Sequence, residues 1–272
     1  MALRLAIAGA GGRMGQAVIE AALASSDMEI ASALDIPDSA FVGHDAGERF
    51  GRTTGASVQA DVDAAVRAAD VLIDFTRPAG SIAHIAACVR HRVGAVIGTT
   101  GLDAEQQRQL AEHARTVPIV YAPNMSVGVN VLLELVENAA RALGSAYDIE
   151  ILEIHHKHKV DAPSGTAIQL GKAASAGRAL DFASSAVYSR EGDVGPRKPD
   201  AIGFATLRGG DVVGEHTVMF VGPGERIEIT HRATSRQNFA AGALRAARFV
   251  AAKRSAGVGG LFDMRDVLGL NG

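Results

Sequence analysis

The first half of the chain alternates short apolar runs with longer stretches of helical periodicity, and this alternation limits the fold more than any other feature. Five short, mostly apolar runs, each with at least one β-branched residue, are predicted strands: 3–8, 30–34, 71–75, 95–97 and 119–121. A helix over 103–115 is predicted as well, because Asp103 and Gln106 have the spacing of a capping box. This alternation predicts an α/β fold, with a doubly wound parallel sheet covered by helices on both faces.

The second half of the chain has a different pattern, in which strands predominate. Four further strands are predicted at 149–154, 202–207, 211–221 and 226–231, with one helix after Pro163. Residues 177–200 are polar and contain glycine and proline, which predicts a long loop or lid. Because 272 residues, 47% of them hydrophobic, suffice for two cores, we expect a domain of residues 1–127 plus 240–272 and a second, mixed α+β domain of residues 128–239.

Composition excludes several classes of partner. A net charge of −3 and an isoelectric point near 6.3 leave no global basic field, which argues against nucleic acid. The single cysteine, Cys88, falls in a predicted helix, so we expect a buried thiol in a protein of the reducing cytosol. No segment approaches the ~20 uninterrupted apolar residues of a membrane span. The expectation is a cytoplasmic protein with no membrane partner.

A glycine-rich loop follows the first predicted strand and opens the next helix. It comprises Gly9, Ala10, Gly11, Gly12, Arg13, Met14 and Gly15. Glycines there make the turn and let the backbone approach a pyrophosphate, which then faces the amide groups of the helix N-terminus. An acidic residue, Asp35, ends the second strand, where a ribose hydroxyl needs an acceptor. We therefore predict a dinucleotide site at residues 9–14 and Asp35, although a tight turn without a ligand is the alternative.

The residues around Asp35 also indicate which dinucleotide is preferred. A carboxylate accepts hydrogen bonds from a ribose 2′-OH but repels a 2′-phosphate, and the next residue is Ile36 instead of an arginine. The sequence therefore predicts a preference for NADH. Arg13 is a cation that could still admit NADPH.

Two further loops follow predicted strands at the same edge of the sheet. Gly98, Thr99, Thr100 and Gly101 come after strand 95–97 and could hold the nicotinamide end; an ordinary turn is an equal alternative. The segment Ala122, Pro123, Asn124 and Met125 follows strand 119–121 and could form a passage between the domains. Both segments are candidate cofactor contacts.

Three histidines and two lysines lie together at the end of strand 149–154. They are His155, His156, Lys157, His158 and Lys159. An isolated histidine usually has only a structural role, but five adjacent basic or titratable residues make a purely structural role less favourable. A metal site is a second reading, and the interleaved lysines count against it because ammonium groups oppose a bound dication. We expect no metal.

The third reading joins these residues to the helix start that follows. Ser164 is the predicted N-cap, which places the amides of Gly165 and Thr166 at the start of the helix, where they can bind a carboxylate. His155 or His156 with Lys159 could supply a second anion contact and a proton. The segment is therefore predicted to bind a small dicarboxylate.

The motifs together resemble the dihydrodipicolinate reductase family, now called 4-hydroxy-tetrahydrodipicolinate reductases. The resemblance runs nearly end to end, through residues 9–15, 74–76, 98–101, 150–167, 187–192, 203–206, 214–217 and 260–268. It implies a Rossmann-like domain with a second substrate and oligomerisation domain, and NADH- or NADPH-dependent reduction of a cyclic dicarboxylate on the diaminopimelate route to lysine. It also implies a homotetramer.

The resemblance assigns roles to individual residues. It implies that His155 is a proton donor and acceptor, that Lys159 is a proton donor, and that His156, Gly165 and Thr166 bind substrate. It implies cofactor contacts at 9–14, 35, 98–100 and 122–125; Ile36 departs from the arginine common in the family, which weakens expected NADPH binding. Alternatives are a sugar- or inositol-type dehydrogenase, a non-catalytic NAD-sensing regulator and a metal-dependent hydrolase.

Overall fold

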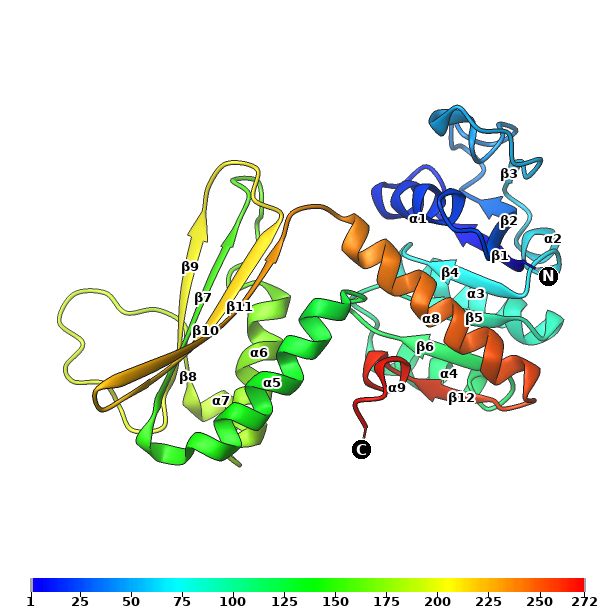
Figure 1. The fold of residues 1–272 in the computed structure, drawn as a ribbon. Helices are drawn as coiled ribbons and strands as arrows, with labels where there is room; N and C mark the ends of the chain where they lie inside the picture. Colours follow the sequence, from blue (N-terminus) through cyan, green and yellow to red (C-terminus); the bar gives the residue numbers. More distant parts are fainter. Residues whose placement is uncertain (1, 272) are drawn as a thin grey trace. The chain divides into compact units, whose positions relative to one another are not determined.

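The computed structural model describes residues 2–271 and divides into two compact units (Figure 1). The first unit contains residues 1–127 and 236–272, and the second contains residues 128–235. The second boundary falls after Ser235 instead of after residue 239, because helix α8 (Gln237–Ser255), which packs in the core of the first unit, begins at Gln237.

The first unit is built on a seven-stranded sheet in which every pair of neighbouring strands is parallel. In spatial order its strands are β12 (Gly260–Phe262), β6 (Pro118–Tyr121), β5 (Gly94–Ile97), β4 (Val71–Asp74), β1 (Leu3–Ala8), β2 (Met28–Leu34) and β3 (Val58–Gln59). Every residue of β4 and β5 is buried, as expected of parallel strands covered on both faces. The predicted doubly wound sheet is confirmed.

Helices cover both faces of this sheet. They are α1 (Arg13–Leu23), α2 (Val62–Arg67), α3 (Pro78–His91), α4 (Ala104–His113), α8 and α9 (Met264–Leu268), with a short 3₁₀ turn η1 (Glu48–Phe50). In β1, Leu5 and Ile7 pack with residues of α1 and α8, whereas Ala6 and Ala8 pack with residues of α2, α3 and α4. Asp103 and Gln106 form the predicted capping box, and Cys88 is fully buried in α3.

The strand order reverses between β1 and β4. The chain runs outward from β1 to β2 and β3, then returns so that β4 lies on the other side of β1, followed by β5 and β6. Because all strands are parallel, the loops after β1, β2, β4, β5 and β6 lie at one edge of the sheet. Ligands of open α/β sheets bind at such a reversal.

The second unit contains a five-stranded mixed sheet. Its strands, in spatial order, are β11 (Glu225–Ala233), β10 (Gly214–Gly222), β7 (Asp148–His155), β9 (Ile202–Arg208) and β8 (Ala186–Val187). Strand β10 runs antiparallel to β7 and β11, whereas β9 runs parallel to β7 and β8. The predicted mixed α+β unit is confirmed.

One face of this sheet carries the core of the second unit. Helices α5 (Val127–Leu143) and α6 (Gly165–Gly177) lie against it (Figure 1), and Val136 and Leu170 pack there with Ile151 and Val218. The predicted helix after Pro163 is confirmed as α6, but it is not the single long helix of this unit, since α5 precedes it. The predicted loop 177–200 also contains α7 (Phe182–Ser185) and β8, and the 3₁₀ turn η2 (Gly144–Ala146) links α5 to β7.

No helix within residues 2–271 is long and apolar enough to cross a membrane.

Candidate active site

The glycine loop after β1 is held in place by close backbone approaches. Gly9 adopts a φ of +70°, which favours glycine. A Cβ on Gly15 would lie 2.0 Å from the Gly9 carbonyl oxygen, so only glycine lets α1 pack this closely on the loop. The amide of Gly11 donates a 2.8 Å hydrogen bond to Oδ2 of Asp35, which joins the two predicted cofactor elements directly.

A cavity of about 810 Å³ opens beside this loop. Five predicted cofactor residues line it: Gly9, Gly12, Arg13, Met14 and Asp35. Ile36 also lies on its wall. Arg77 and His84 also line the cavity and follow β4 at the same edge of the sheet; neither was predicted as a cofactor residue. Their position could have been predicted from the sequence, because they follow a strand that ends where the strand order reverses.

A buried carboxylate, Asp74, organises the loop after β4. It accepts hydrogen bonds from the amide and hydroxyl of Thr76, both at 2.7 Å, and lies 2.8 Å from Nδ1 of His84. Burial alone would raise the pKa of Asp74, but the bonds from His84 and Thr76 outweigh it and hold that pKa below its ordinary value. The Thr99 hydroxyl lies 2.7 Å from that of Ser81, which links this network to the loop after β5.

The other two predicted cofactor segments do not line this cavity. Gly98 packs against the ring of Phe75, and Thr99 is buried, whereas Thr100 is exposed. In the segment Ala122, Pro123, Asn124 and Met125, the Met125 side chain is buried in the core and its carbonyl oxygen lies against Gly242 of α8. Ala10 is likewise buried. The buried members of these segments can reach a cofactor only through backbone groups, whereas Thr100 and Pro123 are exposed at the sheet edge.

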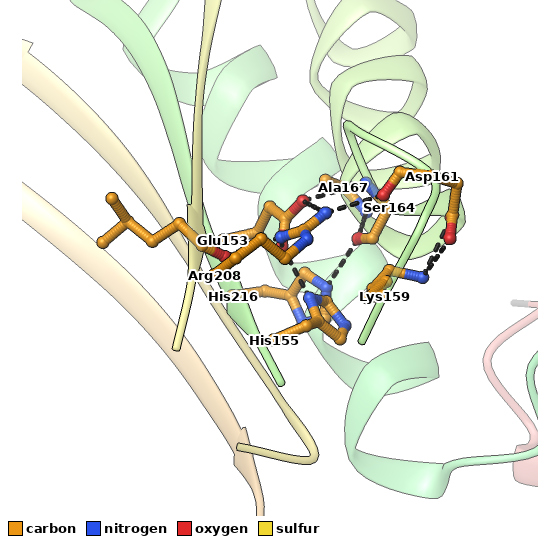
Figure 2. Close-up of polar contacts among 9 residues, drawn as sticks. Glu153, His155, Lys159, Asp161, Ser164, Ala167, Arg208 and His216 are labelled. Carbon is orange, nitrogen blue, oxygen red and sulfur yellow. Dashed lines mark hydrogen bonds and ion pairs between the residues drawn. The ribbon is translucent and has the colours of Figure 1, made fainter. Parts of the chain in front are cut away.

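The histidines and lysines lie in the second unit, at the end of β7 (Figure 2). Glu153 and His155 point to the same face of the sheet as Ile151, as the alternation of the strand predicts. Oε2 of Glu153 lies 2.5 Å from Nδ1 of His155. Glu153 was not predicted as a site residue, although an acidic residue on the same strand face as Ile149 and Ile151 was a usable signal.

Glu153 is 1% exposed and gathers donors from three elements (Figure 2). Both terminal nitrogens of Arg208 donate to it, at 2.8 and 3.0 Å, and the amide of Ser164 donates at 3.0 Å. Burial would raise the pKa of Glu153, but the bonds from Arg208, His155 and Ser164 hold it below its ordinary value. Glu153 is therefore an ionised carboxylate inside the unit.

His155 is held neutral by its surroundings. Burial lowers its pKa below the ordinary value, and the opposing effect of Glu153 does not fully compensate. Its ring meets the ring of His216 edge-on, with centroids 5.1 Å apart. A Cβ on Gly214 would lie 2.9 Å from Nε2 of His155, so this glycine keeps the space beside that nitrogen open.

His216 was not predicted as a site residue, and it is 4% exposed. Its Nε2 lies 3.0 Å from the hydroxyl of Ser164. Burial lowers the pKa of His216 to about 4, with a further contribution from His155. His216 is therefore neutral at physiological pH.

Lys159 and His156 lie on the segment that leads from β7 to α6. Nζ of Lys159 contacts both carboxylate oxygens of Asp161, at 2.7 and 2.9 Å. Nδ1 of His156 is buried and has no hydrogen-bond partner among residues 2–271. Such an unsatisfied group suits a site that binds a polar ligand.

Helix α6 begins as predicted. Ser164 is its N-cap, and the Ser164 hydroxyl accepts a 3.1 Å hydrogen bond from the amide of Ala167. Gly165 and Thr166 form the first turn, where the helix offers no carbonyl acceptors and its dipole favours an anion. The same region thus contains a proton-accepting imidazole, an ammonium group and an anion-binding helix start.

No group of three histidine, cysteine or acidic residues in the described chain is placed to hold a metal ion. Instead, the cationic groups of Lys159 and Arg208 lie on the carboxylates of Asp161 and Glu153. This arrangement can bind an anion and move a proton.

Family models match both parts of the chain. Residues 3–125 match the model described as dihydrodipicolinate reductase, N-terminus, and residues 128–268 match the model described as dihydrodipicolinate reductase, C-terminus.

Individual relatives agree with these matches. The chain is similar to a 4-hydroxy-tetrahydrodipicolinate reductase of Burkholderia ambifaria, at 55% identity over 98% of this chain and 100% of the relative. It is also similar to a solved, dipicolinate-bound dihydrodipicolinate reductase from Paenisporosarcina sp. TG-14, with 25% identity, a TM-score of 0.74, and coverage of 97% of this chain and 98% of that one.

A more distant likeness concerns the fold alone. A myo-inositol 2-dehydrogenase from Lactobacillus plantarum superposes with a TM-score of 0.59 at 9% identity, covering 95% of this chain and 91% of that one. Inositol dehydrogenases therefore share the architecture, as the sequence-based alternative supposed, without sharing the sequence.

Proposed function

The chain belongs to the dihydrodipicolinate reductase family, and from this premise we propose which of its residues bind the two reactants and which move the proton. Its activity is the NAD(P)H-dependent reduction of 4-hydroxy-tetrahydrodipicolinate to tetrahydrodipicolinate in lysine biosynthesis. The reaction takes a hydride and a proton into the ring and releases water. The main support for these residue roles is that His155 lies close to the start of helix α6, to which Glu153 links it.

We assign the dinucleotide to the cavity beside the glycine loop. The close approach of Gly15 to the carbonyl of Gly9 leaves the α1 N-terminus facing that space, which suits a pyrophosphate. Asp35 lies on the same wall, where it can accept from a ribose hydroxyl. The bound dinucleotide supplies the hydride. Residues 98–100 and 122–125 contact it from the sheet edge in this proposal.

The substrate ring carries two carboxylates. The amides of Gly165 and Thr166 bind one carboxylate, because the first turn of α6 presents donors and positive potential. The buried Nδ1 of His156 offers a further polar contact. This clamp orients the ring, which lowers the entropic cost of reaction.

The proton is handled by His155 and Lys159. His155 keeps Nε2 available for exchange with the ring, since its other nitrogen is engaged by Glu153. Lys159 is an ammonium donor that must exchange its contact with Asp161 for the substrate. In this proposal both residues act on the bound ring, His155 as donor and acceptor and Lys159 as donor.

We further propose that NADH is the preferred reductant. The Asp35 carboxylate would repel a 2′-phosphate, and the neighbouring residue, Ile36, provides no cation to bind that phosphate. Arg13 and Arg77 line the same cavity, so NADPH remains a usable second cofactor.

We propose that the chain forms a homotetramer through the outer face of the second sheet. The residues that alternate with the core positions point to its other face; the apolar ones are Leu152, Ile154, Leu207, Met219 and Val221. Leu207 and Val221 are 48% and 38% exposed. An apolar sheet face of this kind is suited to pairing with a second copy.

The decisive experiment is an NADH-oxidation assay on the purified protein, coupled to the upstream synthase with pyruvate and aspartate semialdehyde. Oxidation should require both synthase substrates and should fall about a hundredfold in His155→Gln. Absence of turnover in the wild-type protein would overturn the assigned activity, whereas wild-type turnover in His155→Gln would overturn only the role of that histidine.

A further inference from the structure

We infer that Glu153 is the positioning residue of this site: it fixes the tautomer of His155 and ties that imidazole to the start of helix α6. The inference rests on the proposed role of His155. It adds Arg208 as the cation that keeps Glu153 ionised.

The first support is the placement of Glu153 itself. A carboxylate at an inward-facing strand position costs free energy unless donors surround it. Glu153 is 1% exposed, and its two oxygens receive four donors, two from Arg208 and one each from His155 and Ser164. Each donor has a specific position, so the carboxylate is held in one orientation.

The second support is the hydrogen-bond logic at His155. An ionised carboxylate can only accept, so the proton of the neutral imidazole lies on Nδ1, which donates to Oε2 of Glu153 at 2.5 Å. The lone pair is therefore on Nε2. Gly214 leaves space beside that nitrogen, since a Cβ there would lie 2.9 Å away.

Charged groups from every neighbouring element act on His155. Arg208 of β9 and Lys159 of the following segment lower its pKa, Glu153 of β7 raises it, and His216 of β10 meets its ring edge-on. Glu153 is the acidic group that raises the pKa of His155, so removing its charge should move the titration of His155 to lower pH.

The same carboxylate also reaches the anion-binding helix. Oε1 of Glu153 accepts from the amide of Ser164, the N-cap of α6, and Arg208 also donates a 2.7 Å hydrogen bond to the carbonyl of Asp161. Glu153 therefore holds both the imidazole and the residue that precedes Gly165. This link keeps the proton-transfer group and the carboxylate clamp at a fixed separation.

The test is Glu153→Gln in the full-length enzyme, with NADH oxidation measured across pH. The amide keeps the shape of the side chain but turns one acceptor into a donor, which favours the opposite tautomer of His155. We expect kcat to fall about ten- to a hundredfold, KM for NADH to stay within about twofold of wild type, and the His155-dependent limb of the kcat/KM profile to move about one pH unit lower. That limb is identified as the one abolished in His155→Gln.

Glu150→Gln is the matched control. Glu150 lies on the same strand and also binds an arginine through both oxygens, since Arg190 donates at 2.8 and 2.9 Å, but the bonds described for it include no histidine. Its pH profile should match wild type. Circular dichroism and thermal unfolding must show that both variants fold.

If Glu153→Gln fails to fold, Arg208→Lys provides the second test, because it keeps the charge and loses the bidentate contact. The His155-dependent limb of the kcat/KM profile should again move to lower pH, by less than in Glu153→Gln. If a folded Glu153→Gln or Arg208→Lys variant keeps the wild-type kcat and shows no shift of the His155-dependent limb, the inference is overturned. An unchanged limb in His155→Gln would instead overturn the role of His155.

Discussion

Lys159 and Asp161 form an ion pair in which Nζ lies 2.7 and 2.9 Å from the two carboxylate oxygens. The Lys159 side chain is 19% exposed, whereas that of Asp161 is 55% exposed. The pair contributes little to stability, because solvent screens a partly exposed contact. Asp161 thus positions the ammonium group without burying it, so a bound substrate can compete for it.

Replacing Lys159 with alanine tests its assignment as a proton donor. We expect kcat to fall about a hundredfold or more, as for other general acids, with little change in NADH affinity. The assay is steady-state NADH oxidation combined with a fluorescence titration of NADH.

Lys157→Ala is the control for that experiment, because Lys157 is an exposed lysine two positions away in the same segment. It should turn over like wild type. Near-wild-type kcat in Lys159→Ala would remove Lys159 from the mechanism.

Cofactor preference should respond to the residue after Asp35. Ile36 is 67% exposed and lines the cavity, so Ile36→Arg can be introduced at little cost in stability and places a cation near a 2′-phosphate. We expect kcat/KM for NADPH to rise about tenfold, equivalent to ~1.4 kcal/mol. Ile36→Gln, which adds length without charge, should leave the NADPH/NADH ratio nearly unchanged. A wild-type enzyme that strongly prefers NADPH would contradict the proposed preference.

Much of the fold could be predicted because periodicity is a local property. Strands β1 and β4 are short, mostly apolar runs, and the capping box of α4 joins Asp103 to Gln106, three positions further along the chain. Residues 128–239 were predicted to form the second domain, but no helix was predicted at α5, whose apolar stripe packs against the second sheet. That packing is tertiary and leaves no local signal.

The part of the site that is contiguous in sequence could be predicted, whereas the part contributed by distant strands could not. His155, Lys159 and Ser164 are neighbours in sequence, so their cluster was visible directly. Arg208 and His216 reach it from strands far along the chain, and only the registers of β9 and β10 against β7 bring them to Glu153 and His155. Sheet register depends on long-range pairing, which a single sequence does not reveal.

The proposed tetramer predicts that charge on the second sheet will dissociate it. Leu207→Glu places a carboxylate on the apolar face of β9, where burial against a second copy would be costly. Light scattering should give a smaller mass than for wild type. Glu105→Gln, in the exposed first turn of α4, should leave the mass unchanged. A wild-type monomer at assay concentration would contradict the proposal.

Gly165→Ala separates the substrate clamp from the fold. An added Cβ there meets nothing within 4 Å, so the unfolding free energy should stay the same or rise by less than about 1 kcal/mol. A methyl group beside the first-turn amide should nevertheless hinder a bound carboxylate. We expect KM for the dicarboxylate to rise about tenfold (~1.4 kcal/mol) with KM for NADH unchanged. An unaltered dicarboxylate KM would argue against this helix start as the clamp.

Stability should fall on mild acidification because of His216. Its pKa is about 4 in the folded protein against an ordinary 6.5, so the unfolded chain binds the proton more readily and stability is lost as pH falls from about 6.5 towards 4. At pH ~5 the loss from this residue should be about 2 kcal/mol relative to pH ~8. His155 and His231, whose pKa values are also lowered by burial, add to it in the same direction. Urea unfolding at the two pH values measures the difference, which should shrink in His216→Gln. His44→Gln, at an exposed histidine, should show the full wild-type loss; an equal loss in His216→Gln would mean that the buried imidazole does not control it.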